Sequence, residues 1–300
     1  HGDILRRVLG RVMRMATVDL HMHSTASDGR LSPADLVALA AERGLEVIAL
    51  TDHDTLRGIP AAQAAGRELG VRVLAGIEIS GRYPDGQCHL LAWLPDPVPE
   101  PFAAWTLEKE RDREDRAQQM VERLQAHGAR ITWDDVRSRA AGNIGRPHVA
   151  AALIASGDAA DKTDAFDRWI GRDGPGYVPS GKIDPVEAVA LAAGAGALVS
   201  LAHPYTLELD DAALDAFVAT LAEAGLGAIE AHRGDQDPER QAAYRAIAQR
   251  HGLLVSPGSD FHGDERAARD LGTTGEPGIA ADDLAALLSR LPGGPDGPAG

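Results

Sequence analysis

Nine histidines and carboxylates fall at or just after short apolar segments of the sequence. A lone histidine in such a place is more often structural than metal-binding, but nine groups together reverse that expectation. Imidazole and carboxylate without thiolate are ligands for Zn²⁺, Mn²⁺ or Fe²⁺, and this many exceed the needs of one tetrahedral ion. The sequence therefore predicts two or three divalent ions with bridging carboxylates. The nine candidate ligands are His21, His23, Asp28, His53, Glu78, His89, His203, Asp260 and His262.

The spacing of two ligand pairs indicates how they share an ion. Residues two apart on a β-strand point to the same side, so we expect His21 and His23 to face one cavity. The same spacing leads us to expect that Asp260 and His262 also share a face.

Two further carboxylates, Asp52 and Asp54, flank the candidate ligand His53. They suit a supporting role, in which a carboxylate accepts a hydrogen bond from a metal-bound imidazole and orients it. Solvent-facing or helix-capping roles are equally compatible with the sequence, so both alternatives stay open.

The ligands depend for their placement on short apolar strands that alternate with alanine-rich helices. Residues 17–23 are followed by a helix over 33–42, a strand over 46–53, a helix over 59–69 and a strand over 72–80. This alternation predicts a parallel α/β sheet or barrel. Because such barrels place active sites at the C-terminal ends of their strands, we expect the nine ligands to converge there.

The middle of the chain departs from this alternation. Residues 98–180 are charged and helical in period, without a convincing strand, and predict an inserted helical subdomain. The charge run is more typical of a solvated helix face than of a binding surface. The alternation resumes from residue 186 and fades after Leu288, and residues 289–300 predict a disordered tail.

Composition narrows the partners. A net charge of −15 disfavours binding to duplex DNA unless metal ions or clustered basic side chains supply positive charge. The sole cysteine, Cys88, excludes an internal disulfide. The sequence contains no apolar run of about 18 residues, the length needed to span a membrane. The first fifteen residues lack the apolar core of a secretory signal, so we expect a cytoplasmic protein. The only lysines, Lys109, Lys162 and Lys182, are interpreted as compositional bias.

The motifs DLHMHSTASDG, ALTDHDT, GIEIS, CHLLAW, AHP and GSDFHG resemble, in order and spacing, those of the PHP (polymerase and histidinol phosphatase) family. The likeness covers roughly residues 17–100 and 183–265. It implies a distorted (β/α)7 barrel built from residues 16–97 and 181–288, with the nine candidates as its metal ligands. It also implies a phosphoric ester hydrolase that uses two or three Mn, Fe or Zn ions.

Within the family, the segments GNIGRPHVA and GPGYVP resemble the branch that dephosphorylates nucleotides, including 3′,5′-nucleoside bisphosphates and short oligoribonucleotide ends. The resemblance implies that the insertion, residues 98–180, caps the substrate. It also implies that Arg146 and His148 contact the substrate phosphate, for which the arginine fork is suited. The alternative is that Arg146 merely starts a helix in which His148 is buried.

Other basic groups are weaker candidates for substrate binding. Arg172 and Lys182 flank the GPGYVP turn and are as compatible with a solvent-exposed role. Asp237 stands where relatives often carry a histidine before a Pro-Glu pair, and His232 and Arg233 are candidates to compensate for it.

No Ser-, Cys- or P-loop-based motif is present, so metal-bound hydroxide is the expected nucleophile. In the working hypothesis Glu78 bridges two ions; His21, His23 and Asp260 hold one, His89 another, and Asp28 with His53 a third, while His203 and His262 stay unassigned. Glu78, Asp260, Arg146 and His148 are the candidate catalytic residues. We expect a phosphomonoesterase for a nucleotide-like substrate; the alternatives are a phosphodiesterase or 5′-3′ exonuclease on short RNA ends, and a non-catalytic metal-binding module. Amidohydrolase chemistry is disfavoured because no lysine lies on a predicted strand.

Overall fold

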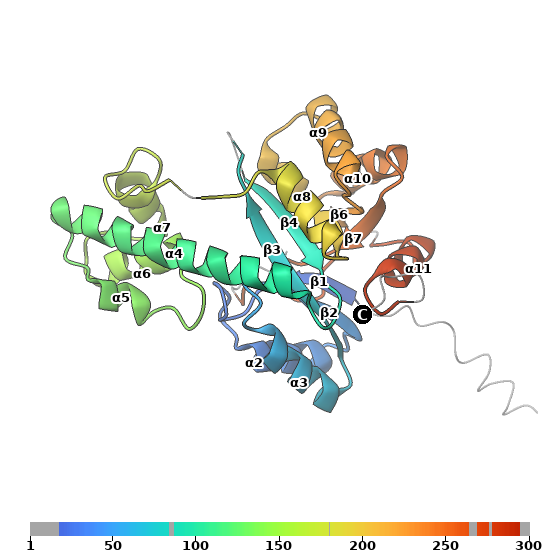
Figure 1. Ribbon diagram of the computed structural model, residues 1–300, viewed down its shortest axis with the longest axis horizontal. Helices are drawn as coiled ribbons and strands as arrows, with labels where there is room; N and C mark the ends of the chain where they lie inside the picture. Colours follow the sequence, from blue (N-terminus) through green and yellow to red (C-terminus); the bar gives the residue numbers. More distant parts are fainter. Residues whose placement is uncertain (1–17, 84–86, 180, 264–268, 276–277, 295–300) are drawn as a thin grey trace, which may run out of the picture.

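The computed structural model describes residues 18–83, 87–179, 181–263, 269–275 and 278–294. Seven strands form one sheet in sequence order (Figure 1). They are β1 (Val18–Met22), β2 (Val47–Leu50), β3 (Arg72–Gly81), β4 (Cys88–Trp93), β5 (Leu198–Leu201), β6 (Ala228–His232) and β7 (Leu254–Pro257). A bridge between Met22 and Phe261 joins the two ends of the sheet, which is nearly closed into a barrel. The predicted seven-stranded α/β barrel is confirmed.

One strand, β4, breaks the parallel pattern that the alternation predicted. Strands β1 to β3 and β5 to β7 pair in parallel, whereas β4 is antiparallel to both β3 and β5. Only residues 82–87 separate β3 from β4, which is too short for the helical crossover that a parallel connection needs. As a result, the first residues of β4 lie at the same rim as the last residues of the other strands.

Helices cover the outside of the barrel (Figure 1). They are α2 (Pro33–Glu42), α3 (Ile59–Leu69), α8 (Pro185–Gly194), α9 (Asp211–Glu223), α10 (Pro238–Arg250) and α11 (Ala281–Arg290), with a 3-10 turn η2 (Pro204–Leu207). Helices α2 and α3 begin and end at the residues that the sequence predicts. Ser32 accepts a hydrogen bond from the Asp35 amide at the start of α2. Gly70 ends α3 in the left-handed region, with φ of 74°.

The long connection between β4 and β5 contains helices and no strand within its described residues. It comprises α4 (Glu100–Ala126), α5 (Trp133–Arg137), α6 (Arg146–Ala155), α7 (Lys162–Ala165) and a π-helical turn η1 (Phe166–Ile170). Figure 1 shows α4 running outward from the barrel, with α5, α6 and α7 packed near its far end. These helices bury a core of their own, separate from the barrel cores, with Leu124, Val136 and Leu153 among its members.

The C-terminal prediction needs a correction. Helix α11 extends to Arg290, and Leu291 is fully buried with Leu284 and Leu287 against residues that begin the strands, such as Val18. The start of the expected disordered tail, residues 289–294, is therefore ordered, because its leucine covers the end of the barrel opposite the candidate ligands. Residues 295–300, and the first residues of the predicted barrel, 16 and 17, lie outside the described chain. Among the described helices, none is long and apolar enough to cross a membrane.

Substitutions along α4 test whether the insertion's core contributes to stability. Leu124 is fully buried, while Leu107 on the same helix is 48% exposed. Leu124→Ala should lower the free energy of unfolding by about 2–5 kcal/mol, because it leaves a cavity. Leu107→Ala should stay within about 0.5 kcal/mol of the parent. Urea denaturation followed by circular dichroism measures both, and equal losses would contradict the packing described above.

Candidate metal centre and its cavity

All nine predicted ligands meet at one rim of the barrel, and the carboxylate of Glu78 lies at their centre. Its Oε1 atom is 2.8 Å from Nδ1 of His89 and 2.9 Å from Nε2 of His203. Its Oε2 atom is 3.3 Å from Nε2 of His21, 3.1 Å from Nε2 of His23 and 3.2 Å from Nδ1 of His53. Five imidazoles therefore surround one fully buried carboxylate.

Eight of the nine candidates fall into three groups, each compact enough to hold one metal ion, whereas His203 contacts Glu78 but belongs to none of the groups. The groups are His21, His23, Glu78 and Asp260; His53, Glu78 and His89; and His23, Asp28, His53 and His262. Several buried atoms in them have no hydrogen-bond partner, namely Nδ1 of His23, Nδ1 of His53 and Oε2 of Glu78. Buried polar atoms are rarely left unpaired, so these orphaned donor atoms and the nitrogen–oxygen ligand set fit divalent ions.

Three candidate ligands reach the centre by routes other than the one predicted. His89 lies at the start of its strand, not the end, and arrives at the rim because β4 is reversed. Asp260 and His262 follow β7, and Asp260 has a left-handed backbone with φ of 55°, so strand alternation does not apply to them. They belong to different groups: Asp260 joins His21 and His23, whereas His262 joins Asp28 and His53.

Glu230, which was not among the residues predicted from the sequence, contacts the His21 ring on the side away from Glu78. It is fully buried in the middle of β6, and its Oε1 lies 2.7 Å from Nδ1 of His21. Its Oε2 accepts a hydrogen bond from the backbone amide of His203 at 2.8 Å. Glu230 thereby fixes the His21 ring with Nε2 facing the metal groups. The signal was available, because Glu230 lies in β6, the one strand to which no ligand had been assigned.

Two arginines hold the outer oxygen of Asp260. Arg233, which is fully buried, lies 3.4 Å from Asp260 Oδ2 and also donates to Glu230 and Asp235. Arg269 donates to Asp260 Oδ2 at 3.0 Å and to Asp235. The other oxygen, Oδ1, is left facing His21 and His23.

Asp52 and Asp54 hold loops, not imidazoles. Asp52 accepts hydrogen bonds from the amide and hydroxyl of Ser24 at 2.8 and 2.7 Å. Asp54 accepts from the Ser80 amide at 2.8 Å and from the guanidinium of Arg113. Neither carboxylate therefore takes the ring-orienting role suggested for it, which Glu230 fills at His21.

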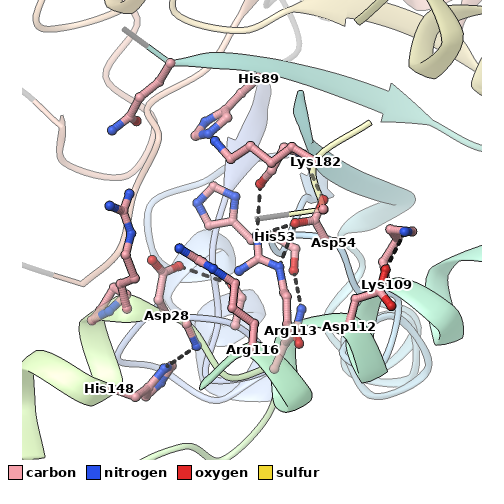
Figure 2. A pocket seen from close by; sticks show the side chains of 18 of the residues that line it. Asp28, His53, Asp54, His89, Lys109, Asp112, Arg113, Arg116, His148 and Lys182 are labelled. Carbon is pink, nitrogen blue, oxygen red and sulfur yellow. Dashed lines mark hydrogen bonds and ion pairs between the residues drawn. The ribbon is translucent and has the colours of Figure 1, made fainter. Parts of the chain in front are cut away.

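A cavity of about 610 Å³ lies over the metal groups, between the barrel rim and the insertion. Asp28, His53 and His89 form part of its wall, and a second cavity of about 340 Å³ shares these three side chains. The larger cavity is lined by six basic side chains: Lys109, Arg113, Arg116, Arg146, Lys162 and Lys182. Figure 2 shows Arg116 and Lys182 directed into the same space that His53 and His89 face.

The basic side chains of this cavity lie close enough to disfavour one another's charge. Burial, together with Arg146 and Arg113, lowers the pKa of Arg116 to about 10. Burial also lowers the pKa of Lys182, and the nearby arginines add to this effect. A bound phosphate would relieve this repulsion.

The two candidates of the GRPH segment both line the larger cavity. Arg146 opens α6, and its guanidinium lies 5.3 Å from the centre of the Phe166 ring. Nδ1 of His148 accepts a hydrogen bond from the Gly145 amide at 3.1 Å. The segment therefore starts a helix, as the structural alternative held, and also presents both side chains to the cavity.

The weaker substrate candidates separate clearly. Lys182 lines the larger cavity, whereas Arg172 is exposed and His232 is buried, and neither lines the two cavities. Nδ1 of His232 instead lies 3.2 Å from Gln241, on the outer side of β6. Asp237 caps α10 by accepting from the Arg240 amide. The structure therefore gives no support to substrate contacts by His232 or Arg172.

The scarce lysines, which the sequence alone attributes to compositional bias, share one location. All three lysines of the chain line the larger cavity, as does Asn143, its only asparagine. Lysine and asparagine are thus found nowhere in this chain except around the larger cavity. None of the lysines lies on a strand, which agrees with the argument against a carbamylated-lysine centre.

Comparisons with known proteins agree with this geometry. Residues 19–136 match the family model of the PHP domain. The chain is 33% identical over 263 residues to the 3′,5′-nucleoside bisphosphate phosphatase of Chromobacterium violaceum, covering 87% of this chain and 92% of that one. It is 32% identical over 245 residues to a 5′-3′ exoribonuclease of Haemophilus influenzae, covering 81% and 89%. A metal-dependent phosphoesterase structure from Bifidobacterium adolescentis superposes with a TM-score of 0.76 at 34% identity, covering 91% and 96%.

The chain belongs to the PHP family. The family inferred from the sequence motifs is thereby confirmed, and so is the class of enzyme, a hydrolase of phosphate esters.

Glu230→Gln tests the support of His21. The substitution keeps the shape of the side chain but removes the charge that holds the imidazole, so the affinity for Mn²⁺ should fall about 10- to 100-fold. Competition against a chelating dye measures this affinity. Asp237→Asn, which alters a carboxylate outside the two cavities, should leave it unchanged. Equal affinities in Glu230→Gln and the parent would show that the carboxylate does not act through His21.

Metal binding should release protons. Burial opposes protonation of His21, but Glu230, Glu78 and Asp260 outweigh it and raise its pKa to about 10. The metal-free imidazole is thus protonated below that pH, and an ion must displace a proton, so metal affinity should rise with pH. Titration calorimetry at about pH 7.5 in buffers of different ionisation enthalpy should show buffer-dependent heats that correspond to at least about one proton per chain. Heats independent of the buffer would contradict this prediction.

Proposed function

We propose that this protein hydrolyses a phosphomonoester of a nucleotide-like molecule, such as a nucleoside 3′,5′-bisphosphate or a nucleoside monophosphate. The observation that carries the proposal is the cavity of about 610 Å³, whose wall combines candidate metal ligands with six basic side chains and two aromatic residues, Trp105 and Phe166. One phosphate fits over the metal groups, a second phosphate fits among the lysines and arginines, and the aromatic nucleobase fits against Trp105 and Phe166.

The charge balance supports an anionic substrate. Three carboxylates, those of Asp28, Glu78 and Asp260, belong to the ligand groups, and the other ligands are imidazoles that bind as neutral groups. Two or three divalent ions would therefore leave the centre net positive, although the chain as a whole is acidic. Mn, Fe and Zn all suit this mixture of nitrogen and oxygen ligands.

In the proposed reaction, Glu78, which belongs to two of the groups, and Asp260 would hold divalent ions together with the neighbouring imidazoles. Divalent ions held by the three groups would lower the pKa of a bound water and draw charge from the phosphate oxygens. Arg146 and Lys182 orient the phosphate and neutralise the charge that develops on it. The insertion, which supplies Arg146 and His148, covers the substrate and excludes water.

His148 acts in this scheme as a neutral hydrogen-bond donor. Its Nδ1 accepts from the Gly145 amide, which leaves the proton of the neutral ring on Nε2. Burial lowers its pKa, so the neutral form is favoured at pH 7. Such a ring can donate to a phosphate oxygen without carrying a charge.

Hydrolysis of short RNA ends is the second candidate, and the likeness to the Haemophilus influenzae exoribonuclease supports it. Both reactions would use the same metal centre and the same basic cavity. A non-catalytic role is disfavoured, because eight of the nine candidate ligands fall into three adjoining groups and the ninth, His203, contacts Glu78.

An assay of Mn²⁺-loaded protein distinguishes these functions. The substrates are a nucleoside 3′,5′-bisphosphate, a 5′-monophosphate, a cyclic phosphate and a short 5′-phosphorylated RNA, with release of phosphate and of mononucleotide measured separately. We expect phosphate release from the bisphosphate to have the highest kcat/KM. Mononucleotide release from RNA as the faster reaction would favour the exonuclease, and turnover of none of the four would refute the enzymatic proposal.

Arg146→Ala and Arg172→Ala form a matched pair, because both remove an arginine of the insertion but only Arg146 lines the cavity. Loss of hydrogen bonds to a charged phosphate, each about 1.5–3 kcal/mol, should lower kcat/KM by about 10- to 150-fold in Arg146→Ala. Arg172→Ala should match the parent. A similar loss in both variants, or in neither, would show that Arg146 is misassigned.

A further inference from the structure

The loop after β2, residues 51–57, carries His53, which belongs to two of the three metal groups. On its inner side, this loop is tied to β3, because the Glu78 amide donates to the Asp52 carbonyl and the Asp54 amide donates to the Glu78 carbonyl. The carbonyl of His53 itself points the other way, toward the insertion. Its partner there is the side-chain amide of Asn143, which donates to it at 2.8 Å.

Asn143 also holds a second ligand loop. Its backbone amide donates to the carbonyl of Ala26 at 2.7 Å, two residues before the candidate ligand Asp28. The approach is close, because a Cβ atom added to Gly142 would lie 2.1 Å from that carbonyl oxygen. A side chain at position 142 would therefore push the loops apart. His53 and Asp28, which Asn143 thus ties together, lie in the same metal group.

Helix α4 of the insertion braces the same loop from its other side. Asp54 has a left-handed backbone with φ of 50°, which is unfavourable for a residue with a side chain. Its carboxylate is held by Arg113, which also donates to the Ser80 hydroxyl at 2.9 Å. The next residue, Thr55, donates to the buried carboxylate of Glu110. The loop that carries His53 is thus clamped between α4 and the segment before α6.

The same short segment leads directly to the phosphate-binding side chains. Asn143 is 6% exposed, and only two residues separate it from Arg146 at the start of α6. Its two hydrogen bonds therefore fix the distance between the metal ligands and the side chains proposed to grip phosphate. Asn143 is also the only asparagine of the chain, which sets it apart from the prevailing composition.

We propose that Asn143 is a positioning residue through which the insertion holds His53 and Asp28 in place for metal, so that metal occupancy and phosphate binding by Arg146 and His148 are coupled. The coupling runs in both directions, because a contact that favours the metal-bound arrangement must also be favoured by it. The link to phosphate rests on the proposed function, whereas the link to metal does not.

The test compares Asn143→Ala with Arg168→Ala, which removes an exposed ion pair from the same insertion, outside both cavities. Each protein is stripped with a chelator, reloaded with Mn²⁺ and passed through a desalting column. Mn²⁺ is then counted by mass spectrometry, and melting temperatures are taken with and without metal. Asn143→Ala should fold but lose the stability of about one buried hydrogen bond when metal-free. It should retain about one Mn²⁺ fewer per chain and gain less stability from metal than the parent does, whereas Arg168→Ala should behave as the parent does.

Phosphate binding supplies the second readout. Calorimetry with inorganic phosphate and Mn²⁺-loaded protein should show a dissociation constant at least about tenfold higher in Asn143→Ala. If that variant fails to fold, Asn143→Asp is the alternative. It keeps the shape of the side chain and the hydrogen bond from the backbone amide to the Ala26 carbonyl, but it places a carboxylate oxygen next to the His53 carbonyl, so the same losses are expected.

Three results would overturn parts of this proposal in distinguishable ways. A full Mn²⁺ count in folded Asn143→Ala and Asn143→Asp would refute the positioning role. Loss of Mn²⁺ with unchanged phosphate affinity would refute the coupling to Arg146 and His148. Because the metal count needs no turnover, a parent protein that hydrolyses none of the esters but shows this loss would refute the proposed function and leave the positioning role standing.

Discussion

The burial of one carboxylate, Glu78, is the constraint on which the rest of the centre depends. Moving a charged carboxylate out of water costs several kcal/mol unless positive charge compensates it. Burial alone would favour the protonated acid, but His53, His89, His21 and their neighbours outweigh it and hold the pKa of Glu78 well below its usual value. An imidazole must lose its extra proton, and with it its positive charge, before it can bind a metal ion. Divalent ions would then replace the protons as the positive charge that stabilises the buried carboxylate of Glu78.

The fold determines which side chains can surround Glu78. Parallel strands bring their C-terminal ends to one rim. The reversed β4 adds His89, its second residue, which pairs with Ser80. The buried carboxylate of Glu230 orients the His21 ring. Arg233 and Arg269 orient the carboxylate of Asp260. The insertion adds the side chains that we propose bind phosphate and, through Asn143, contacts the backbone of the loop that carries His53.

Local patterns predicted much of this from the sequence. Strand spacing placed His21 and His23 together, and their Nε2 atoms lie 3.2 Å apart. Capping residues gave α2 its exact predicted ends in Pro33 and Glu42. The motif order then identified the family, because nine ligands in sequence are far more specific than any one of them.

Features that depend on tertiary structure could not be read in the same way. The direction of β4 follows from a short connection whose length alone does not reveal its geometry, and the backbone at Asp260 is left-handed, which strand periodicity does not anticipate. The contact of Asn143 with the His53 loop and the gathering of the three lysines around one cavity depend on how the insertion packs against the rim. Leu291 likewise has a structural role that a Gly- and Pro-rich context conceals.

The central claim is that Glu78 lies between divalent ions, and anomalous X-ray diffraction at the manganese absorption edge tests it most directly. Crystals of Mn²⁺-loaded protein soaked in inorganic phosphate should show two or three anomalous peaks, with Glu78 oxygens bridging two of them and phosphate density on the side of Arg146. Peaks that avoid Glu78, or a single peak with Glu78 unligated, would contradict the account.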